Sequence, residues 1–429
     1  MNTLGDIPLT ARHLGLPDRA VGMTTAEFLA TAPCLSEFWT PLIVLDDKAM
    51  QHNIETMATW CAQRGLEIMP HGKTTMAPAL WQRQLDAGAL GITLATMGQV
   101  RTARTFGVSS IMLANAAVDA NALRYLAGEL ADPDFRFISW ADSLATIDAM
   151  EAPLREAKTP RPVDVLVEIG ADGGRTGART IDEAIAIAER IAASDVLRLA
   201  GVAGYEGCLA HDRSDAALNA VESYLATQID LHERISHLYD DGDVYVTAGG
   251  SGFFDRVAQA FAAAGARADA GERPGGGRTF FTLRSGAYIV HDEGLYHGIS
   301  PFDQGRESHE KPRFAVGMFG VGRVTSHPEP VLALIDGGKR DFPFDEDLPV
   351  PRAKSVQLGG AWQPLPGASV SAMNDQHTYV RLEEDLLKIG DVVRLGLSHP
   401  CTSFDKWTVL PVVESADSDV VVDLAHTFF

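Results

Sequence analysis

The sequence has few cysteines and no long apolar run. Only four cysteines occur among 429 residues, and no two of them form a Cys-x-x-Cys pair. This sparseness excludes a disulfide framework and is typical of a reducing compartment. No run approaches the roughly 18 apolar residues that a membrane-spanning helix needs, and the first residues lack the basic and apolar stretches of a secretory leader. We therefore expect a cytoplasmic protein with no membrane partner.

Positive charge is also scarce. The chain has 36 Lys and Arg against 57 Asp and Glu, which gives a formal net charge of -21 at pH 7. A field of this sign repels nucleic acid, so we expect no nucleic-acid partner. Hydrophobic residues at 46% and charged residues at 22% are ordinary for a globular protein. The length suits one large domain and a smaller one.

What the chain does have is a regular alternation of short apolar strands and helical segments. Helical patterns at 77–87, 119–130, 180–193 and 214–238 lie between the strands, and alternation of this kind predicts parallel strands with right-handed crossovers. Eight such units favour a closed (β/α)8 TIM-like barrel over an open doubly wound sheet, and no Gly-x-Gly-x-x-Gly turn follows the first strand. The predicted strands are 66–73, 91–96, 110–115, 135–140, 163–169, 199–205, 244–248 and 280–286.

After about residue 295 the helical periodicity disappears and strand-like segments dominate, such as 314–318, 331–335 and 391–395. We therefore expect a barrel over residues 47–295, followed by a β-rich domain over 296–429, with 1–46 as an N-terminal extension. The glycine-rich run 271–277 precedes the last barrel strand and is interpreted as a surface insertion.

Lys73 ends the first predicted strand, among small polar residues. Active residues of a barrel enzyme lie at the carboxyl ends of its strands. Desolvation at such a place lowers the pKa of a lysine enough for its amine to attack a carbonyl and form a Schiff base. The alternative is a lysine that simply closes a strand in solvent.

The loop after the seventh strand contains Gly249, Gly250 and Ser251. Small residues at this place allow backbone N–H groups to converge on a phosphate, with help from the Ser251 hydroxyl. A plain flexible loop is the alternative. A reactive lysine combined with a phosphate cradle suggests pyridoxal 5'-phosphate (PLP) as the cofactor.

Two more strand ends carry polar side chains. Arg175 lies on a glycine-rich loop after the fifth strand, where it could hold a phenolic oxygen of the cofactor or a substrate carboxylate, or pair with Asp172. Tyr205 follows the sixth strand and is a candidate to line the cofactor. His211, six residues later, is a candidate acid or base, although a lone histidine is more often structural.

His399 and Cys401 lie close together in the β-rich domain. On an extended segment residues i and i+2 face the same side, so an imidazole and a thiolate could bind one ion. These ligands favour zinc over magnesium. The alternative is a buried cysteine near a structural histidine.

Together these motifs, in this order, resemble the alanine-racemase-like (fold type III) PLP enzymes, and more narrowly the D-serine dehydratase/D-threonine aldolase family. The resemblance implies that Lys73 forms the Schiff base and that His399 and Cys401 bind a divalent metal, Zn²⁺ or alternatively Mn²⁺. It also implies that the first 46 residues join the β-rich domain and that the protein is a homodimer. The cofactor residues it implies are Arg175, Tyr205, Gly249, Gly250, Ser251 and Tyr288.

The expected activity is that of a lyase on small β-hydroxy-D-amino acids. The His-x-Cys pair resembles the dehydratase members, which release a 2-oxo acid and ammonia, whereas aldolases typically have Asp at the position of Cys401. His211 matches the position of a histidine implicated in aldolase catalysis, which gives glycine and an aldehyde. An amino-acid racemase and a non-catalytic PLP-binding protein are the remaining alternatives.

Overall fold

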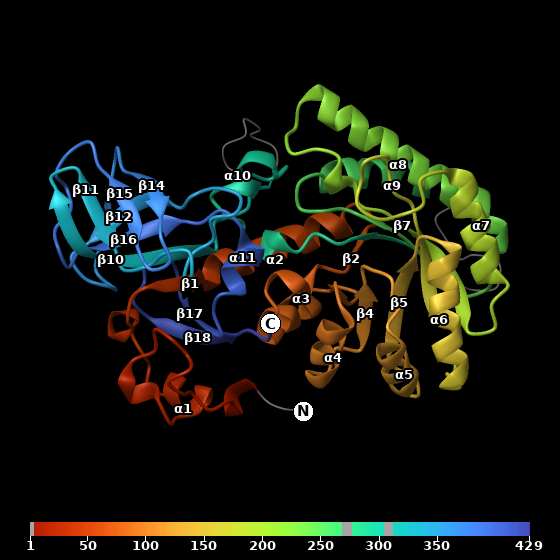
Figure 1. Ribbon diagram of the computed structural model, residues 1–429, viewed down its shortest axis with the longest axis horizontal. Helices are drawn as coiled ribbons and strands as arrows, with labels where there is room; N and C mark the ends of the chain where they lie inside the picture. Colours follow the sequence, from red (N-terminus) through yellow and green to blue (C-terminus); the bar gives the residue numbers. More distant parts are fainter. Residues whose placement is uncertain (1–3, 268–276, 304–311) are drawn as a thin grey trace. The chain divides into compact units, whose positions relative to one another are not determined.

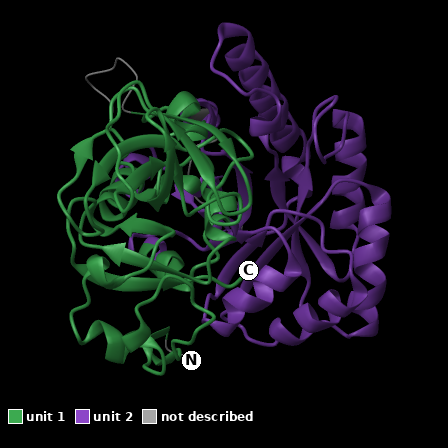
Figure 2. Ribbon diagram, turned by 60° about the vertical axis from the view of Figure 1, so that its left-hand side comes forward, with its two compact units in different colours: residues 1–57, 74–83, 287–429 green, residues 58–73, 84–286 purple. Residues whose placement is uncertain are grey.

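The computed structural model describes residues 4–267, 277–303 and 312–429, so most of the glycine-rich run 271–277 lies outside the described residues. The chain forms two compact units that interleave along the sequence (Figure 2): residues 1–57, 74–83 and 287–429 make unit 1, and residues 58–73 and 84–286 make unit 2. These units are defined by their compactness, whereas the sequence analysis placed domain boundaries after residues 46 and 295. Those two boundaries stay predictions. Helices α2 (Asp47–Ala62) and α3 (Pro78–Asp86) pass from one unit to the other.

Unit 2 contains one parallel sheet with the strand order β2-β9-β8-β7-β6-β5-β4-β3 (Figure 1). Its two end strands are linked as well, because Leu90 N donates to Ile68 O at 2.9 Å and Thr93 N donates to Pro70 O at 2.9 Å. The eight predicted strands therefore form one barrel sheet. Their bounds are β2 Glu67–Ile68, β3 Ile92–Leu94, β4 Ser110–Leu113, β5 Arg136–Ala141, β6 Val163–Glu168, β7 Leu197–Ala203, β8 Val244–Ala248 and β9 Thr279–Leu283.

The helices of unit 2 begin at side chains that suit a helix N-terminus. Thr96, Asp119, Ser143, Thr180 and Ser214 each accept a hydrogen bond from a backbone N–H of the first turn that follows. No described helix is both long and apolar enough to cross a bilayer. The helices are α4 Met97–Thr105, α5 Ala120–Glu129, α6 Leu144–Glu156, α7 Ile181–Ala192, α8 Asp215–Ile235 and α9 Phe254–Arg267.

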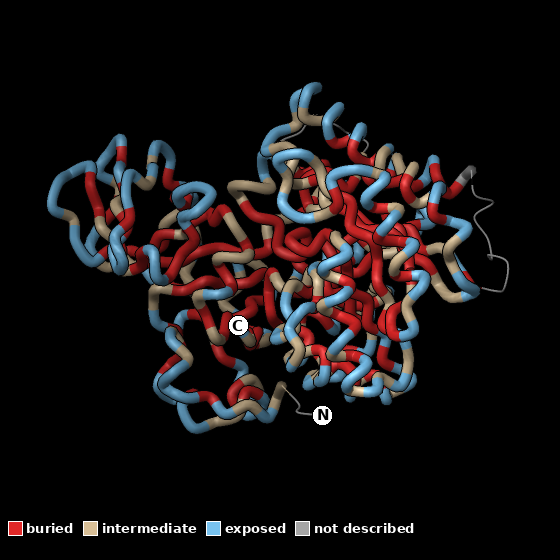
Figure 3. Tube along the Cα trace, turned by 45° about the vertical axis from the view of Figure 1, so that its right-hand side comes forward, coloured by how far each residue is buried: buried red, intermediate tan, exposed pale blue. Residues whose placement is uncertain are grey.

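Buried apolar side chains from most of the barrel strands pack together in one cluster. Figure 3 marks the buried residues along the chain in red. Trp140 is 1% exposed, and the rings of Tyr245 and Phe280 stack with their centroids 5.3 Å apart. A barrel filled in this way is a packed core rather than a pore, so its chemistry belongs to the loops at the carboxyl ends of the strands.

Unit 1 contains a 10-stranded sheet with the order β13-β12-β16-β10-β1-β17-β18, to which β11, β15 and β14 are attached through β10. The strand β1 pairs antiparallel with β10 and parallel with β17. The bounds are β1 Leu42–Asp46, β10 Met318–Glu329, β11 Leu332–Ile335, β12 Val350–Ser355, β13 Gln363–Pro364, β14 Ser369–Met373, β15 Thr378–Arg381, β16 Val392–Gly396, β17 Val409–Val413 and β18 Val421–His426; the helices are α1 Thr25–Leu29, α10 Leu295–Ile299 and α11 Pro400–Phe404.

The segment before β1 lies along the end of the sheet formed by β18. Leu35 N donates to Asp419 O at 2.7 Å, and Val421 N donates to Pro33 O at 3.0 Å. The Thr25 hydroxyl contacts the Nε2 atom of His426 at 2.7 Å. These bonds satisfy backbone groups that an edge strand would otherwise expose.

Candidate functional site

Lys73 lies in a single 3₁₀ turn, Gly72–Thr74, after the first barrel strand. The hydrogen-bonded main chain continues beyond β2, because Met69 N donates to Leu283 O at 2.8 Å and His71 N donates to Arg284 O at 3.1 Å. The predicted strand 66–73 was therefore too long, since the turn replaces its last residues. The half-buried lysine still lies at the carboxyl end of the barrel sheet, where the sequence predicted it.

Positive charge gathers around His71. Its Nδ1 atom is buried and has no hydrogen-bond partner among the described residues. Burial holds the pKa of His71 well below its usual value, and the neighbouring charges of Lys73, Arg284 and Arg175 lower this pKa further. A neutral imidazole among three cations indicates a local positive field, which suits an anionic ligand despite the acidic chain as a whole.

Arg284 contributes to this field, and the sequence reasoning did not assign it a role. The residue is 1% exposed, and burial lowers the pKa of its guanidinium to about 10. Nη1 donates to Thr247 Oγ1 at 2.7 Å, and the guanidinium lies 4.8 Å from the Trp140 ring. The sequence signal was one arginine near the end of the predicted apolar strand 280–286.

Arg175 and Tyr205 are brought together. The guanidinium carbon of Arg175 lies 4.8 Å from the centroid of the Tyr205 ring. Burial, with a contribution from the Glu206 carboxylate, raises the pKa of Tyr205 to about 12. Tyr205 is therefore a protonated hydroxyl at neutral pH and can donate a hydrogen bond. The structure groups these two predicted cofactor residues, whereas their roles stay predictions.

The loop at Gly249, Gly250 and Ser251 differs from the expected phosphate cradle. Gly249 N donates to Glu206 Oε2 at 3.0 Å and Gly250 N donates to Glu206 Oε1 at 2.7 Å. Two N–H groups predicted to meet a phosphate thus meet a buried carboxylate. The next polar side chain along the chain is that of Ser251, and the first turn of α9 follows, where Arg256 N donates to Phe253 O at 2.9 Å and Val257 N donates to the same oxygen at 3.2 Å.

The two remaining predicted catalytic or cofactor residues are His211 and Tyr288. His211 is exposed, in the segment between the 3₁₀ turn Glu206–Cys208 and α8. Tyr288 belongs to unit 1, is 4% exposed and packs against Phe314 with ring centroids 5.9 Å apart.

His399 and Cys401 lie in unit 1, at the start of a helix rather than on an extended segment. His399 is the N-cap residue of α11, and Pro400 occupies the first helical position, which proline favours. The argument from i and i+2 on a strand was therefore wrong. The two side chains still interact: burial lowers the pKa of His399, but hydrogen bonding with Cys401 and the charge of Asp345 outweigh it and raise the pKa to about 9.

Cys401 also contacts the chain next to the lysine. Its Sγ atom lies 3.5 Å from the Oγ1 atom of Thr74, and Thr74 directly follows Lys73 in the sequence. This contact lies within unit 1, to which residues 74–83 belong.

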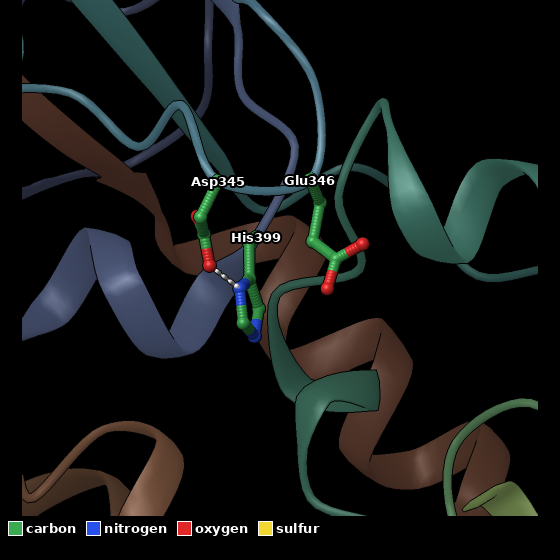
Figure 4. A group of neighbouring side chains, drawn as sticks. All are labelled: Asp345, Glu346 and His399. Atoms are coloured by element: carbon green, nitrogen blue, oxygen red, sulfur yellow. Dashed lines mark hydrogen bonds and ion pairs between the residues drawn. The ribbon is translucent and has the colours of Figure 1, made fainter.

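Asp345 and Glu346 approach His399, which the sequence reasoning missed (Figure 4). One ligand atom from each of these three residues lies within 4.8 Å of the others. Asp345 Oδ2 is 2.6 Å from His399 Nδ1, and Asp345 Oδ1 accepts a hydrogen bond from Thr402 Oγ1 at 2.6 Å. An imidazole with a neighbouring thiol and carboxylates is a donor set that fits a divalent transition metal. The missed signal was the acidic run Asp345 to Asp347.

Two known protein families match this chain. The family described as "Alanine racemase, N-terminal domain" matches residues 45–264, and the one described as "Putative serine dehydratase domain" matches residues 317–413.

Characterised relatives are similar over most of the chain. D-threonine aldolase of Arthrobacter sp is 26% identical over 379 residues, which are 87% of this chain and 89% of that protein. 3-Hydroxy-D-aspartate aldolase of Paracoccus denitrificans (strain Pd 1222) is 23% identical over 383 residues, with the same shares of the two chains, 87% and 89%.

Solved structures share the fold. D-threonine aldolase from Filomicrobium marinum aligns with a TM-score of 0.77 at 23% identity, over 92% of this chain and 97% of that one. D-threo-3-hydroxyaspartate dehydratase from Delftia sp. HT23 aligns with a TM-score of 0.71 at 22% identity, over 92% and 99% of the two chains.

Proposed function

Because the chain belongs to the family described as "Alanine racemase, N-terminal domain", we propose that it is a PLP- and divalent-metal-dependent lyase of β-hydroxy-D-amino acids. In the finer proposal it is a dehydratase that converts D-serine or D-threonine to a 2-oxo acid and ammonia. The observation that carries the finer proposal is the position of Cys401 in the first turn of α11, the helix that His399 caps.

The residues of unit 2 fit PLP. Lys73 supplies the amine, the positive field around His71 suits the phosphate and carboxylate groups, and the buried Nδ1 of His71 has no hydrogen-bond partner among the described residues. When bound, PLP withdraws electrons from the carbon that loses its proton. Lys73 Nζ would be the base that takes this proton. Tyr205 donates a hydrogen bond and Arg175 offers its charge beside the Tyr205 ring.

The residues of unit 1 fit a divalent metal. His399 and Cys401 would hold the ion, Zn²⁺ by preference because a thiolate is among the ligands, and Mn²⁺ as the alternative. Such an ion acts as a Lewis acid on the β-hydroxyl group and eases its departure. Asp345 restrains the imidazole through Nδ1.

D-threonine aldolase activity is the second candidate. Two relatives with aldolase names cover 87% of the chain, and His211 follows Tyr205 by six residues. In this alternative a base takes the proton of the β-hydroxyl group, the Cα–Cβ bond breaks, and glycine and an aldehyde form.

Product analysis by NMR tests the proposal. Purified protein with PLP and Zn²⁺ receives D-serine and D-threonine in turn. Pyruvate or 2-oxobutyrate with ammonia supports the dehydratase, and glycine with acetaldehyde from D-threonine supports the aldolase. Conversion to the L-amino acid or no turnover contradicts both. Lys73→Ala should lose the reaction and the Schiff-base absorbance, whereas the exposed control Lys388→Ala should retain both.

A further inference from the structure

Asp345 is held on both of its oxygen atoms by residues at the start of α11. Oδ2 lies 2.6 Å from His399 Nδ1, and Oδ1 accepts the Thr402 hydroxyl at 2.6 Å (Figure 4). Thr402 and His399 are three residues apart around one helical turn, so both face the same carboxylate. The carboxylate is thereby fixed relative to the imidazole.

The hydrogen bond to Asp345 determines which nitrogen of His399 can bind a metal. An ionised carboxylate only accepts hydrogen bonds, so Nδ1 must carry the proton that it donates to Asp345. Nε2 is then the nitrogen left to bind a metal, and it gives up its own proton when the metal binds. Cys401 lies two residues along, in the first turn of the helix that His399 caps, and supplies a thiol there.

We propose that Asp345 is a positioning residue that orients His399, so that Nε2 of His399 and Sγ of Cys401 hold the metal and neither Asp345 nor Glu346 is a ligand. This inference rests on the proposed metal dependence. It differs from the other ligand set that the structure offers, in which Asp345, Glu346 and His399 would all bind one ion. Asp345 already has a partner on each oxygen, and Glu346 is exposed.

Metal affinity distinguishes the two ligand sets. Zn²⁺ dissociation constants are measured by chelator competition for the wild type, Asp345→Ala, Asp345→Asn and Glu346→Gln. Asp345→Ala should weaken binding about 10- to 100-fold, the range typical of lost outer-shell partners. Asp345→Asn should weaken it less, since its amide oxygen still accepts the Nδ1 proton. Glu346→Gln, the matched loss of one adjacent charge, should leave the affinity unchanged.

Cobalt substitution supplies a second readout. Co²⁺ bound to the wild type and to Asp345→Ala should show the same thiolate-to-cobalt charge-transfer band, which Cys401→Ser should abolish. An affinity that falls as much in Glu346→Gln as in Asp345→Ala would establish the carboxylate ligand set and overturn the inference. An unchanged affinity in Asp345→Ala would overturn it as well.

Failure of the inference can be separated from failure of the proposed function. If the wild type binds no metal, or if its cobalt spectrum does not depend on Cys401, the proposed metal dependence fails. If the band depends on Cys401 but the Asp345 variants bind normally, only the role of Asp345 fails. Thr402→Val, which removes the second bond to Asp345, provides a variant in case Asp345→Ala does not fold, and it should weaken Zn²⁺ binding in the same direction.

Discussion

Glu206 accepts a hydrogen bond from the backbone N–H of Gly250 at 2.7 Å, and its other oxygen accepts the N–H of Gly249. Glu206 follows β7 and the two glycines follow β8, which is the neighbouring strand. Gly249 has φ of +98°, a conformation that side chains disfavour. The buried carboxylate therefore holds a turn that glycine adopts readily and that leads to the first turn of α9.

Replacing Glu206 by Gln should loosen this turn. The amide retains one acceptor but presents an N–H group to the second backbone N–H, so one charge-assisted bond is lost. Hydrogen bonds to charged groups contribute about 1.5–3 kcal/mol, so we expect the free energy of unfolding to fall by about 2 kcal/mol. PLP affinity, followed by absorbance titration, should fall about tenfold because the predicted phosphate ligand Ser251, which directly follows Gly250, is displaced with the turn.

The exposed residue Glu189 gives the control for Glu206→Gln, since Glu189→Gln removes the same charge from the surface of α7. Unchanged unfolding in denaturant and unchanged PLP binding in Glu206→Gln would show that the turn holds without the carboxylate.

The barrel could be predicted because its signal is local. Each strand is a short apolar run, and the predicted strand 244–248 has the same limits as β8. The interleaving of the two units has no such signal. Residues 74–83 lie between two barrel strands in the sequence, yet they belong to the unit that contains the β-rich sheet. The division into two compact units depends on contacts between segments that are distant in the sequence. The hydrophobic periodicity of the sequence carries no information about such contacts.

The sequence predicted which types of residue the candidate site contains, but not which of them form hydrogen bonds with one another. Glu206 and Gly250 are 44 positions apart and meet only because their strands are neighbours, so no spacing rule indicated that the amides were already used. Asp345 and His399 are 54 positions apart. The start of a helix at Pro400, by contrast, could have been predicted from the sequence, because proline at the first helical position is a local signal.

His211→Asn separates the two candidate activities. His211 is exposed in the segment before α8, and a dehydratase that uses Lys73 as its base has no step for it. We therefore expect ammonia release from D-serine to stay within about threefold of the wild type. If glycine formation from D-threonine is the true reaction, its rate should fall about 100-fold or more, which is typical of a lost general base. A large loss of ammonia release would contradict the assignment of the base to Lys73 alone.

Gly201→Ala should destabilise the barrel. Gly201 has φ of +129°, and an added Cβ would lie 2.0 Å from the carbonyl oxygen of Tyr245 on the neighbouring strand. Both strands would have to separate, so we expect the free energy of unfolding to fall by more than about 3 kcal/mol. Gly65→Ala is the matched control, because Gly65 also has a positive φ, +62°, but no atom within 4 Å of its added Cβ. Gly65→Ala should cost only about 1 kcal/mol. Equal losses in the two variants, measured by denaturant unfolding, would show that strand contact at Gly201 is unimportant.

His426 should make the stability of unit 1 depend on pH. Its Nε2 atom contacts the Thr25 hydroxyl at 2.7 Å and the residue is 4% exposed. Burial, and then the charge of His13, lower the pKa of His426 from 6.5 to about 4. The folded state therefore disfavours the protonated form.

Because the pKa of His426 is lower in the folded state than in the unfolded state, low pH destabilises the protein. Above pH 6.5 the imidazole is neutral in both states and its contribution to stability is fully present. Between pH 6.5 and about 4 the unfolded chain binds a proton that the folded chain does not, so stability falls as the pH falls. The full loss corresponds to about 3 kcal/mol, since one pKa unit is worth about 1.4 kcal/mol. His426→Gln removes the titrating group while an amide can still bond Thr25. The unfolding free energy of the wild type minus that of the variant should therefore fall steadily from pH 7 to pH 4, and a constant value over that range would mean that His426 does not titrate in a buried site.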